Sequence, residues 1–503
     1  MNHPHHTRRP PTEGFTVGRR VRGGELVPLH ATSRSGAVGL RVRHATTGVV
    51  VWTADRVAVG DHPTPDEAWR VGCDWPVASE IPTDPAWPGG VYLVDLVDDD
   101  PAAPTAHAWF ALGDAPGSDR PVLLLATNTW NAYNQWGGRC MYTGGAEMSF
   151  RRPLEPGYLE RPVDSDGYDG RLAASAHDPT HQRVIDYQRR HDLPLWTSSS
   201  GWFSFERRFA RWAMDAGVEL DVATDLDLHT DGELLAGRSL LLVVGHSEYW
   251  SAAMRDHVDA FLAAGGNVAV FSGNTCFWQV RIEDDVMVCH KGRARFDDPI
   301  EDRSLLTSMW SDPLIGRPEN RTFGLSFTRG GYHRIGEAVP RGSGGYTVHR
   351  PDHWALTGTG LRLGDQLGDR AGVVGYEVDG CEVELRDGLP VPTGADGTPT
   401  DLEIIASAPA RLISITDDVC EAPEPLWASV DPPGDLEGTA WMLFGDAEPA
   451  TVARLAQGRC VLASCRRGAG AVFHAGSTDW VHGLGADPLI DRITRTVVER
   501  LSR

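Results

Sequence analysis

The 503-residue sequence contains a single lysine, Lys291, although lysine and arginine together number 47. Acidic residues number 69, and the formal net charge is −22. A protein of this charge lacks the basic face that binds nucleic acid, and it is not suited to docking on anionic lipid. The sequence also has no uninterrupted apolar run near 18 residues, so no segment is predicted to span a bilayer. We therefore expect neither nucleic acid nor a membrane as a partner.

Cysteine is scarce as well, and the eight cysteines are scattered without a CxxC pair. This spacing excludes a zinc ribbon and a dithiol redox motif. The first 14 residues are polar, rich in His, Arg and Pro, and lack the apolar core of a secretory signal. We expect residues 1–14 to form a disordered tail and the protein to be cytoplasmic and reduced.

Apolar residues make up 41% of the chain and charged residues 23%, the balance of a globular protein. Residues 15–115 consist of short segments in which polar and apolar residues alternate, with Gly, Pro and Asp between them. Such alternation, with turn signals every few residues, predicts an antiparallel β-sandwich of the immunoglobulin-like kind. The sequence PGSDR at 116–120 is the expected linker.

Residues 121–503 have a different pattern, and we predict one α/β domain there. The apolar runs PVLLLA at 121–126, LLLVVG at 240–245 and NVAVFSG at 267–273 indicate strands buried on both faces. Segments with helical spacing at 202–216 and 251–264 alternate with these strands, which favours a doubly wound sheet. Residues 322–433 return to turns and short strands and are predicted to be a β-rich insertion. The run GAVFHAG at 470–476 is expected to rejoin the parent sheet.

Three of the predicted strands end in polar residues. These are the segment 128–138, the segment with His246 and Glu248, and the segment with Asn274 and Cys276. Because the carboxyl ends of parallel strands meet at one edge, where open α/β sheets bind ligands, we expect a site there. Each residue also has a simpler interpretation. Glu248 could simply stabilise the positive end of the helix that follows it. His246 could be an ordinary loop histidine, and Asn274 could be a turn residue that bonds its own backbone. Cys276 lacks the flanking glycines of a nucleophile elbow and is more typical of a structural thiol.

Several motifs resemble one family. The segments NTWNAYNQWGGRCMY, GHSEYWS, FSGNTCFWQVR, VVGYE and HAGSTDWVHGL are similar to the catalytic domain of the large subunit of N,N-dimethylformamidase, in blocks from about residue 121 to the end. The preceding β-domain resembles its counterpart only in architecture. The α/β core of this family is similar to class I glutamine amidotransferase-like domains, and this likeness implies the same fold class here.

The resemblance implies a mononuclear ferric ion, Fe(III), held by two tyrosinates and one glutamate. By position in the motifs, Glu248 is the carboxylate ligand and Tyr133 the first tyrosine. The second tyrosine is expected in EPGYLERPVDSDGYDGR, where Tyr168 suits the spacing best. Tyr158 of the same segment and Tyr142 of the first motif are alternatives. The resemblance also implies that His246, Asn274 and Glu377 are the catalytic residues around the metal.

The donor types agree with that implication, because phenolate and carboxylate are hard anionic oxygens that suit a hard ferric ion. We expect a metal-dependent hydrolase of a small N-substituted amide. In this scheme His246 and Asn274 donate hydrogen bonds to the oxyanion, and Glu377 acts as general base or acid. The alternatives are a cysteine-dependent amidotransferase-like enzyme using Cys276 and a non-catalytic carbohydrate- or surface-binding protein. A small partner subunit and a homo-oligomer are both left open.

Overall fold

The computed structural model describes residues 10–114, 117–171, 182–333, 342–417 and 435–503. Strand β1 (Thr12–Phe15) begins inside the segment expected to be a disordered tail, so Thr12, Glu13 and Gly14 are ordered in a sheet. The remainder of that expected tail, apart from residues 10 and 11, lies outside the described residues. None of the described helices is both long and apolar enough to cross a membrane.

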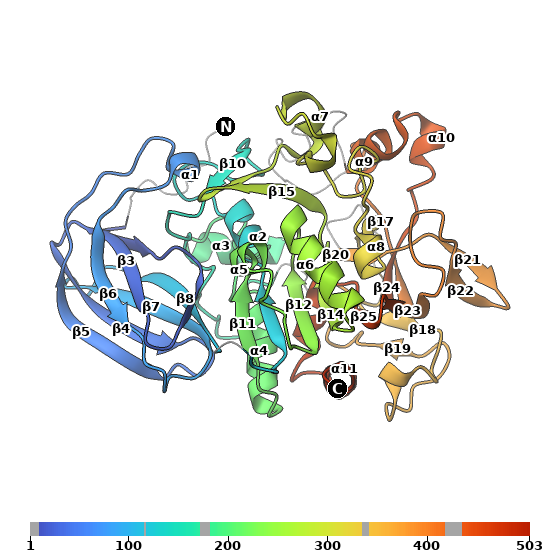
Figure 1. Ribbon diagram of the computed structural model, residues 1–503, viewed down its shortest axis with the longest axis horizontal. Helices are drawn as coiled ribbons and strands as arrows, with labels where there is room; N and C mark the ends of the chain where they lie inside the picture. Colours follow the sequence, from blue (N-terminus) through green and yellow to red (C-terminus); the bar gives the residue numbers. More distant parts are fainter. Residues whose placement is uncertain (1–9, 115–116, 172–181, 334–341, 418–434) are drawn as a thin grey trace.

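The N-terminal part consists of two sheets that pack face to face, in blue at the left of Figure 1. One sheet has the order β2-β8-β7-β4-β5 and the other the order β1-β3-β6. Their shared core comes from alternate residues, such as Leu40 and Val42 of one sheet and Leu29 of the other. The alternation therefore buries one face of each sheet. The strands are β2 (Arg20–Arg22), β3 (Leu26–Ser33), β4 (Ala37–His44), β5 (Val50–Ala58), β6 (Val77–Pro82), β7 (Gly90–Asp98) and β8 (Ala106–Gly113), with α1 (Ala68–Val71) before β6.

The central sheet follows, with the strand order β11-β9-β12-β14-β25-β24-β23-β18-β19. The first five strands are parallel neighbours, and the pairings from β25 to β19 are antiparallel. The strands are β9 (Val122–Leu125), β11 (Asp221–Thr224), β12 (Leu240–His246), β14 (Asn267–Gly273), β18 (Tyr346–Val348), β19 (Gln366–Leu367), β23 (Glu403–Ala410), β24 (Gly458–Arg467) and β25 (Gly470–His474).

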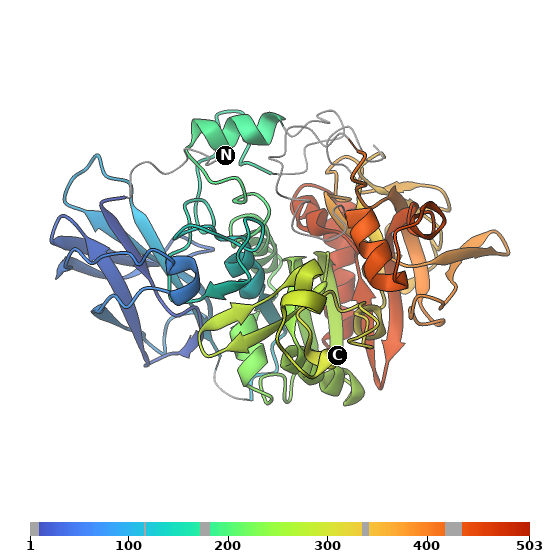
Figure 2. The ribbon, with the colours of Figure 1, turned by 90° about the horizontal axis from the view of Figure 1, so that it is seen from above.

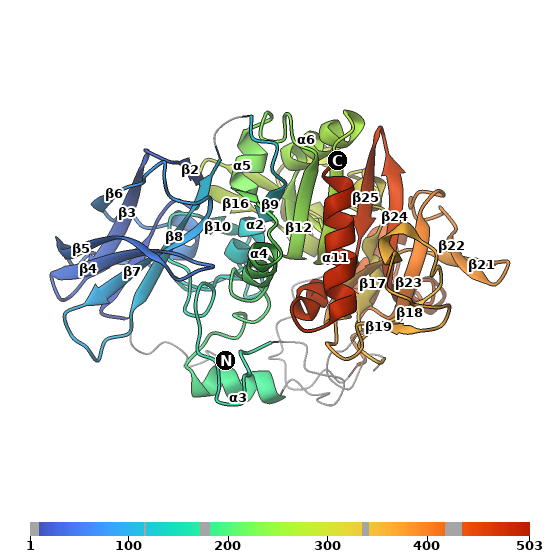
Figure 3. The same cartoon turned by 90° about the horizontal axis from the view of Figure 1, so that it is seen from below.

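Helices cover both faces of the parallel strands, as the views from above and below show (Figures 2 and 3). In β12, Leu241 and Val243 belong to the cluster that includes the apolar residues of α6, whereas Leu242 and Val244 belong to the cluster that includes those of α4 and α11. This double burial explains why the strand reads as a continuous apolar run. The helices are α2 (Thr127–Tyr133), α3 (Gln182–Arg190), α4 (Glu206–Asp215), α5 (Asp225–Thr230), α6 (Ala252–Ala263) and α11 (Pro488–Leu501).

The segment expected to be a β-rich insertion, 322–433, extends the central sheet with β18, β19 and β23. Strand β25 pairs with β14 in parallel and with β24 in the antiparallel sense, so the chain returns to the parent sheet and joins the two parts. The parent sheet and the predicted insertion therefore form one continuous sheet, in which the pairing changes from parallel to antiparallel at β25. The pairs β17–β20 and β21–β22 lie outside that sheet; their bounds are β17 (Ser326–Tyr332), β20 (Glu377–Gly380), β21 (Val383–Arg386) and β22 (Leu389–Pro392).

The other described elements border the carboxyl ends of the parallel strands or lie at the periphery (Figure 1). A four-stranded sheet has the order β10-β16-β15-β13. Its strands are β10 (Glu147–Ser149), β13 (Tyr249–Ser251), β15 (Trp278–Glu283) and β16 (Val286–Val288). The remaining helical elements are α7 (Ala294–Asp297), α8 (Asn320–Phe323), α9 (Asp435–Phe444), α10 (Pro449–Val452), η1 (Lys291–Arg293), η2 (Arg303–Leu305), η3 (Trp354–Leu356) and η4 (Thr478–Gly483).

Candidate active site

Three neighbouring parallel strands deliver polar side chains to one point. Tyr133 is the last residue of α2, which starts two residues after β9 ends. His246 ends β12, Glu248 follows it, and Asn274 follows the end of β14. Asn274 adopts a left-handed backbone with φ of 50°, a conformation that an asparagine tolerates better than most residues and that turns the chain at the strand end.

Glu248 is the centre of a buried group of oxygens. The Tyr133 hydroxyl donates to its Oε2 at 3.0 Å. The Tyr142 hydroxyl lies 2.9 Å from both carboxylate oxygens and 2.7 Å from the Tyr133 hydroxyl. The Tyr249 hydroxyl donates to that of Tyr142 at 3.0 Å. The backbone N–H of Glu248 donates to Thr129 at 2.9 Å, which fixes the carboxylate-bearing segment against α2.

The expected convergence of Tyr168 on this group is wrong. Its hydroxyl donates to the carbonyl of Arg171 at 2.8 Å, and its ring lies under the Arg183 guanidinium and against Tyr187. The loop that carries Tyr168 is closed by its own contacts, including a hydrogen bond from the Asp164 N–H to the Tyr168 carbonyl. Tyr142, one of the two alternatives, occupies the position beside Tyr133.

Tyr158, the other alternative, is fully buried in the main core cluster, and its hydroxyl has no hydrogen-bond partner in the part of the chain that the structure describes. The hydrogen bonds to Glu248 come from the hydroxyls of Tyr133 and Tyr142. Of the two alternatives, Tyr142 therefore has the place that was expected for the second tyrosine.

His246 links the oxygen group to a second carboxylate. Its Nε2 lies 2.7 Å from Oε2 of Glu377 and 3.4 Å from Oε2 of Glu248. Its Nδ1 lies 2.8 Å from the Ser199 carbonyl, which accepts a hydrogen bond from it. Burial alone would lower the pKa of His246, but the charges of Glu377 and Glu248 outweigh it and raise the pKa to about 9. The ring is therefore an imidazolium at neutral pH.

Asn274 is oriented by the same carboxylate, because its side-chain N–H donates to Oε2 of Glu377 at 3.3 Å. Its own Oδ1 is buried and has no hydrogen-bond partner among the described residues. Glu377 is the first residue of β20, so the segment 322–433 supplies one side of the site. Glu377 is thus in contact with both of the other residues predicted from the sequence, His246 and Asn274.

Two further groups at the site were not singled out from the sequence. The Lys291 ammonium lies 3.3 Å from the centroid of the Tyr142 ring, and burial lowers its pKa despite the nearby charge of Glu248. The Tyr376 hydroxyl lies 3.1 Å from Nδ1 of His246. The sequence could have pointed to Lys291, because it is the single lysine of the chain. It offered no indication of a role for Tyr376 beyond the position directly before Glu377.

The oxygen group fits a hard cation. Tyr142 carries one phenolic proton, yet three oxygens of Tyr133 and Glu248 lie within 2.9 Å of its hydroxyl. Oxygens that share an ion at about 2 Å are expected to be roughly 3 Å apart. Burial and the charge of Glu248 raise the pKa of both tyrosines well above the usual value, so in the absence of a cation they stay phenols. No group of three His, Cys, Asp or Glu suited to a metal is found among the described residues, so a metal here depends on the phenolic oxygens.

Cys276 points away from this chemistry. Its side chain is fully buried in the cluster that contains Trp250 and Met254. Burial raises its pKa well above the usual thiol value, which disfavours the nucleophilic thiolate. Its backbone is left-handed, with φ of 56°, and the strained turn serves to pair its N–H with the Ser247 carbonyl at 2.8 Å.

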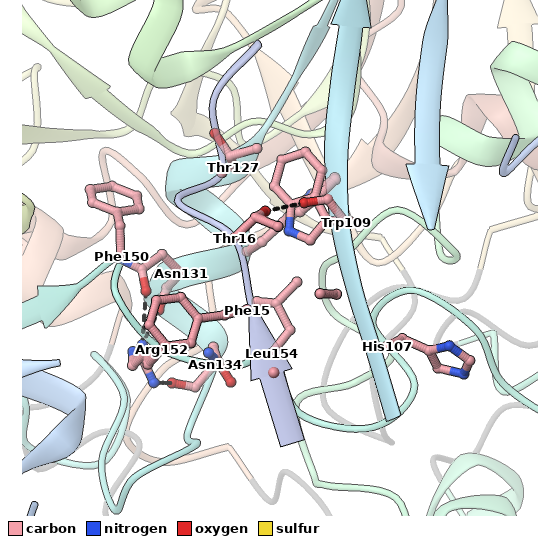
Figure 4. A pocket seen from close by; sticks show the side chains of 14 residues that line it. Phe15, Thr16, His107, Trp109, Thr127, Asn131, Asn134, Phe150, Arg152 and Leu154 are labelled. Carbon is pink, nitrogen blue, oxygen red and sulfur yellow. Dashed lines mark hydrogen bonds between the residues drawn. The ribbon is translucent and has the colours of Figure 1, made fainter. Parts of the chain in front are cut away.

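A separate cavity of about 40 Å³ lies where the N-terminal strands meet α2 (Figure 4). The Arg152 guanidinium, at one side of it, donates to the carbonyls of Ser149, Asn131, Asn134 and Trp136. Those bonds tie α2 and the residues that follow it to β10. The cavity is lined from both the N-terminal strands and α2, so it lies at the boundary between the two regions.

A family model described as N,N-dimethylformamidase beta subunit-like, C-terminal, matches residues 36–493. A comparison with curated proteins gives no significant match. Among solved structures, an alpha-2-macroglobulin of Salmonella matches with 18% identity over 22% of this chain and 8% of that chain, with a TM-score of 0.15. That local likeness is too weak to indicate a shared fold.

Proposed function

The chain belongs to the N,N-dimethylformamidase beta subunit-like family, and on that premise we propose that it is a ferric-iron-dependent hydrolase of small N-substituted amides. The family name itself points to a dimethylformamidase-like amide hydrolase. The observation that supports the metal-dependent reaction is the contact of Tyr133, Tyr142 and Glu248 beside the pair formed by His246 and Glu377.

Tyr133, Tyr142 and Glu248 would hold the ion in this proposal. When bound there, ferric iron supplies Lewis acidity that polarises an amide carbonyl and lowers the pKa of water. The three ligands are anionic once the two phenols lose their protons, which balances the charge of the ion. Lys291, against the face of Tyr142, adds a positive charge that favours the phenolate.

The protein side chains perform the proton transfers. The Glu377 carboxylate takes a proton from water as the water oxygen forms its bond to the carbonyl carbon. His246, as imidazolium, and the side-chain N–H of Asn274 donate hydrogen bonds toward the oxyanion that develops on the carbonyl oxygen. Glu377 then gives its proton to the amide nitrogen as the C–N bond breaks. The products are a carboxylic acid and an amine.

Burial around the site supports this division of roles. His246, Glu248 and Asn274 are each no more than 3% exposed, so their charges and dipoles act in a medium where water screens them weakly. The contact between Glu377 and His246 keeps the general base beside the imidazolium. A fixed arrangement of this kind needs little reorganisation during the reaction.

The test is amine release from a panel of small N-methylated amides by protein of measured iron content. The account predicts equal amounts of acid and amine, loss of activity after chelation, and its return with iron. The family name refers to a subunit, so the proposal includes a small partner subunit. The assay is therefore run on the purified chain alone and on the chain purified from its native cells together with any bound partner. Absence of amide hydrolysis in both preparations, with iron bound, contradicts the proposal.

A further inference from the structure

A second polar cavity is lined in part by Tyr376. It measures about 10 Å³, which is room for about one water-sized group. Tyr376 lines this cavity and also contacts Nδ1 of His246. The cavity and the active site therefore share one side chain.

Three guanidinium groups line the cavity, and two of them are each paired with one carboxylate. Arg171 donates to Asp479 at 2.9 Å, and Arg208 is paired with Asp169. Arg161 forms no ion pair in the described part of the chain, and its Nη atoms donate to the hydroxyls of two serines, Ser198 and Ser204.

Arg161 is a buried cation, and the charge of Asp169 offsets the free-energy cost of its desolvation only in part. The residue is 8% exposed, and its Nε has no hydrogen-bond partner among the described residues. The Nε of Arg208 is likewise buried and without such a partner. The guanidinium of Arg161 lies 4.7 Å from the centroid of the Phe203 ring, but a ring face offsets only part of the desolvation of a charge. Burial lowers the pKa of Arg161 to about 10, a value at which it stays charged at neutral pH.

We propose that Arg161, Arg171 and Arg208 form an anion site that takes the carboxylate group of the substrate or of the acid product. Guanidinium groups bind planar carboxylates through paired N–H bonds, and one carboxylate oxygen fills the water-sized space that the cavity offers. A carboxylate there lies one side chain, Tyr376, away from His246. The assignment of the carboxylate to substrate or product rests on the proposed amide hydrolysis, whereas the anion site itself does not.

The first test is binding of formate and bromide to the purified chain, measured by calorimetry and by anomalous scattering from bromide-soaked crystals. We expect bromide in this cavity and weak formate binding, which Arg161→Met and Arg208→Met each weaken by about tenfold or more. Arg207→Met is the matched control, because Arg207 also stacks on Phe203 but does not line the cavity, and it should leave binding within about twofold. Arg208 is a third exposed, so its variant tests the site even where Arg161→Met fails to fold.

No bromide in the cavity, or formate binding that is unchanged in Arg208→Met, overturns the anion site regardless of whether the protein hydrolyses amides.

The second test uses the hydrolysis reaction. If the carboxylate belongs to the substrate, Arg208→Met raises KM for an N-methyl amide that bears a carboxylate and leaves KM for its neutral analogue unchanged. If it belongs to the product, acetate and formate inhibit hydrolysis of the neutral analogue, and Arg208→Met relieves that inhibition. Equal kinetics in wild type and Arg208→Met on both counts rejects the carboxylate assignment.

Discussion

The Tyr142 hydroxyl lies 2.9 Å from each carboxylate oxygen of Glu248, although the two residues are 106 positions apart in the sequence. The contact brings the loop after α2 against the end of β12. It replaces the expected contact of Tyr168, whose hydroxyl donates to Arg171 instead. The proposed metal site therefore depends on the path of the loop that carries Tyr142.

Substitution of Glu248 by glutamine removes the one carboxylate of the oxygen group and keeps its shape. We expect iron content to collapse and activity to fall by about 10²-fold or more, which corresponds to at least about 2.7 kcal/mol of lost transition-state stabilisation. Metal analysis and amine release measure the two effects. Glu206→Gln is the control, because Glu206 is a buried carboxyl that accepts from the Ala126 N–H and Trp130 outside the oxygen group. Full iron in Glu248→Gln would remove Glu248 from the ligand set.

Substitution of Cys276 by alanine tests the thiol alternative. Because the thiol is buried among apolar side chains and its pKa is raised, activity should stay within about threefold of wild type. Loss of stability should be about 1 kcal/mol, from the small cavity left behind. Steady-state kinetics and thermal unfolding provide both numbers. Inactive Cys276→Ala protein with a normal unfolding transition would favour the cysteine-dependent mechanism.

Replacement of Lys291 by methionine keeps the length of the side chain and removes its charge from the Tyr142 ring. We expect kcat/KM to fall by about tenfold, because a desolvated cation beside an aromatic ring favours the phenolate form. Arg500→Met is the matched control, since it removes an exposed cation from the ring of Trp354, and neither residue belongs to the site. Equal kinetics for wild type and Lys291→Met would show that the charge has no part in the reaction.

The Asp95 carboxylate contacts two arginines and one histidine on the five-stranded N-terminal sheet. It contacts Arg41 at 2.8 Å, Arg43 at 3.0 Å and His107 at 2.9 Å, and its side chain is fully buried. Burial would raise the pKa of Asp95, but its hydrogen bonds to His107 and the arginines outweigh burial and lower the pKa below its ordinary value. A carboxylate with a lowered pKa stabilises the fold above its unfolded pKa near 4, and this stabilisation is lost as the pH falls further.

Asp95→Asn should therefore lower the free energy of unfolding by about 2–3 kcal/mol at pH 7, because it removes the buried carboxylate that pairs with Arg41 and Arg43. The difference from wild type should shrink below about pH 4. Urea unfolding at several pH values measures it. Asp99→Asn is the control, since Asp99 pairs with Arg56 on the exposed surface at 3.0 Å and should cost less than about 0.5 kcal/mol. A difference between wild type and Asp95→Asn that is independent of pH would contradict this account.

The sequence predicts the parallel strands well, because their apolar runs are a direct result of burial on both faces. His246, Glu248 and Asn274 follow such strands, so their meeting at one edge could be predicted from strand direction alone. The likeness of the whole fold to the class I glutamine amidotransferase-like domains stays a prediction. The extension of the central sheet by β18, β19 and β23 was not predicted, since antiparallel strands of an insertion carry no signal for the sheet that they join.

The second tyrosine could not be predicted because both candidate loops are rich in Gly and lack periodicity. Tyr168 had the more favourable spacing, but its ring packs against Arg183 and Tyr187 of α3 instead. Tyr142 reaches Glu248 only because the loop after α2 turns back across the strand ends. Such a path depends on tertiary contacts, among them the hydrogen bond from the Met141 N–H to the Ala132 carbonyl.

The most direct test of the central claim is the iron content and visible absorption of the Tyr142→Phe and Tyr168→Phe variants beside wild type. The account predicts stoichiometric iron and a tyrosinate-to-iron charge-transfer band in wild type and in Tyr168→Phe. It predicts loss of iron, or a weaker and shifted band, in Tyr142→Phe, because one of two phenolate ligands is gone. An unchanged band in Tyr142→Phe together with its loss in Tyr168→Phe would contradict the site, and wild-type protein that binds no iron would contradict the mechanism.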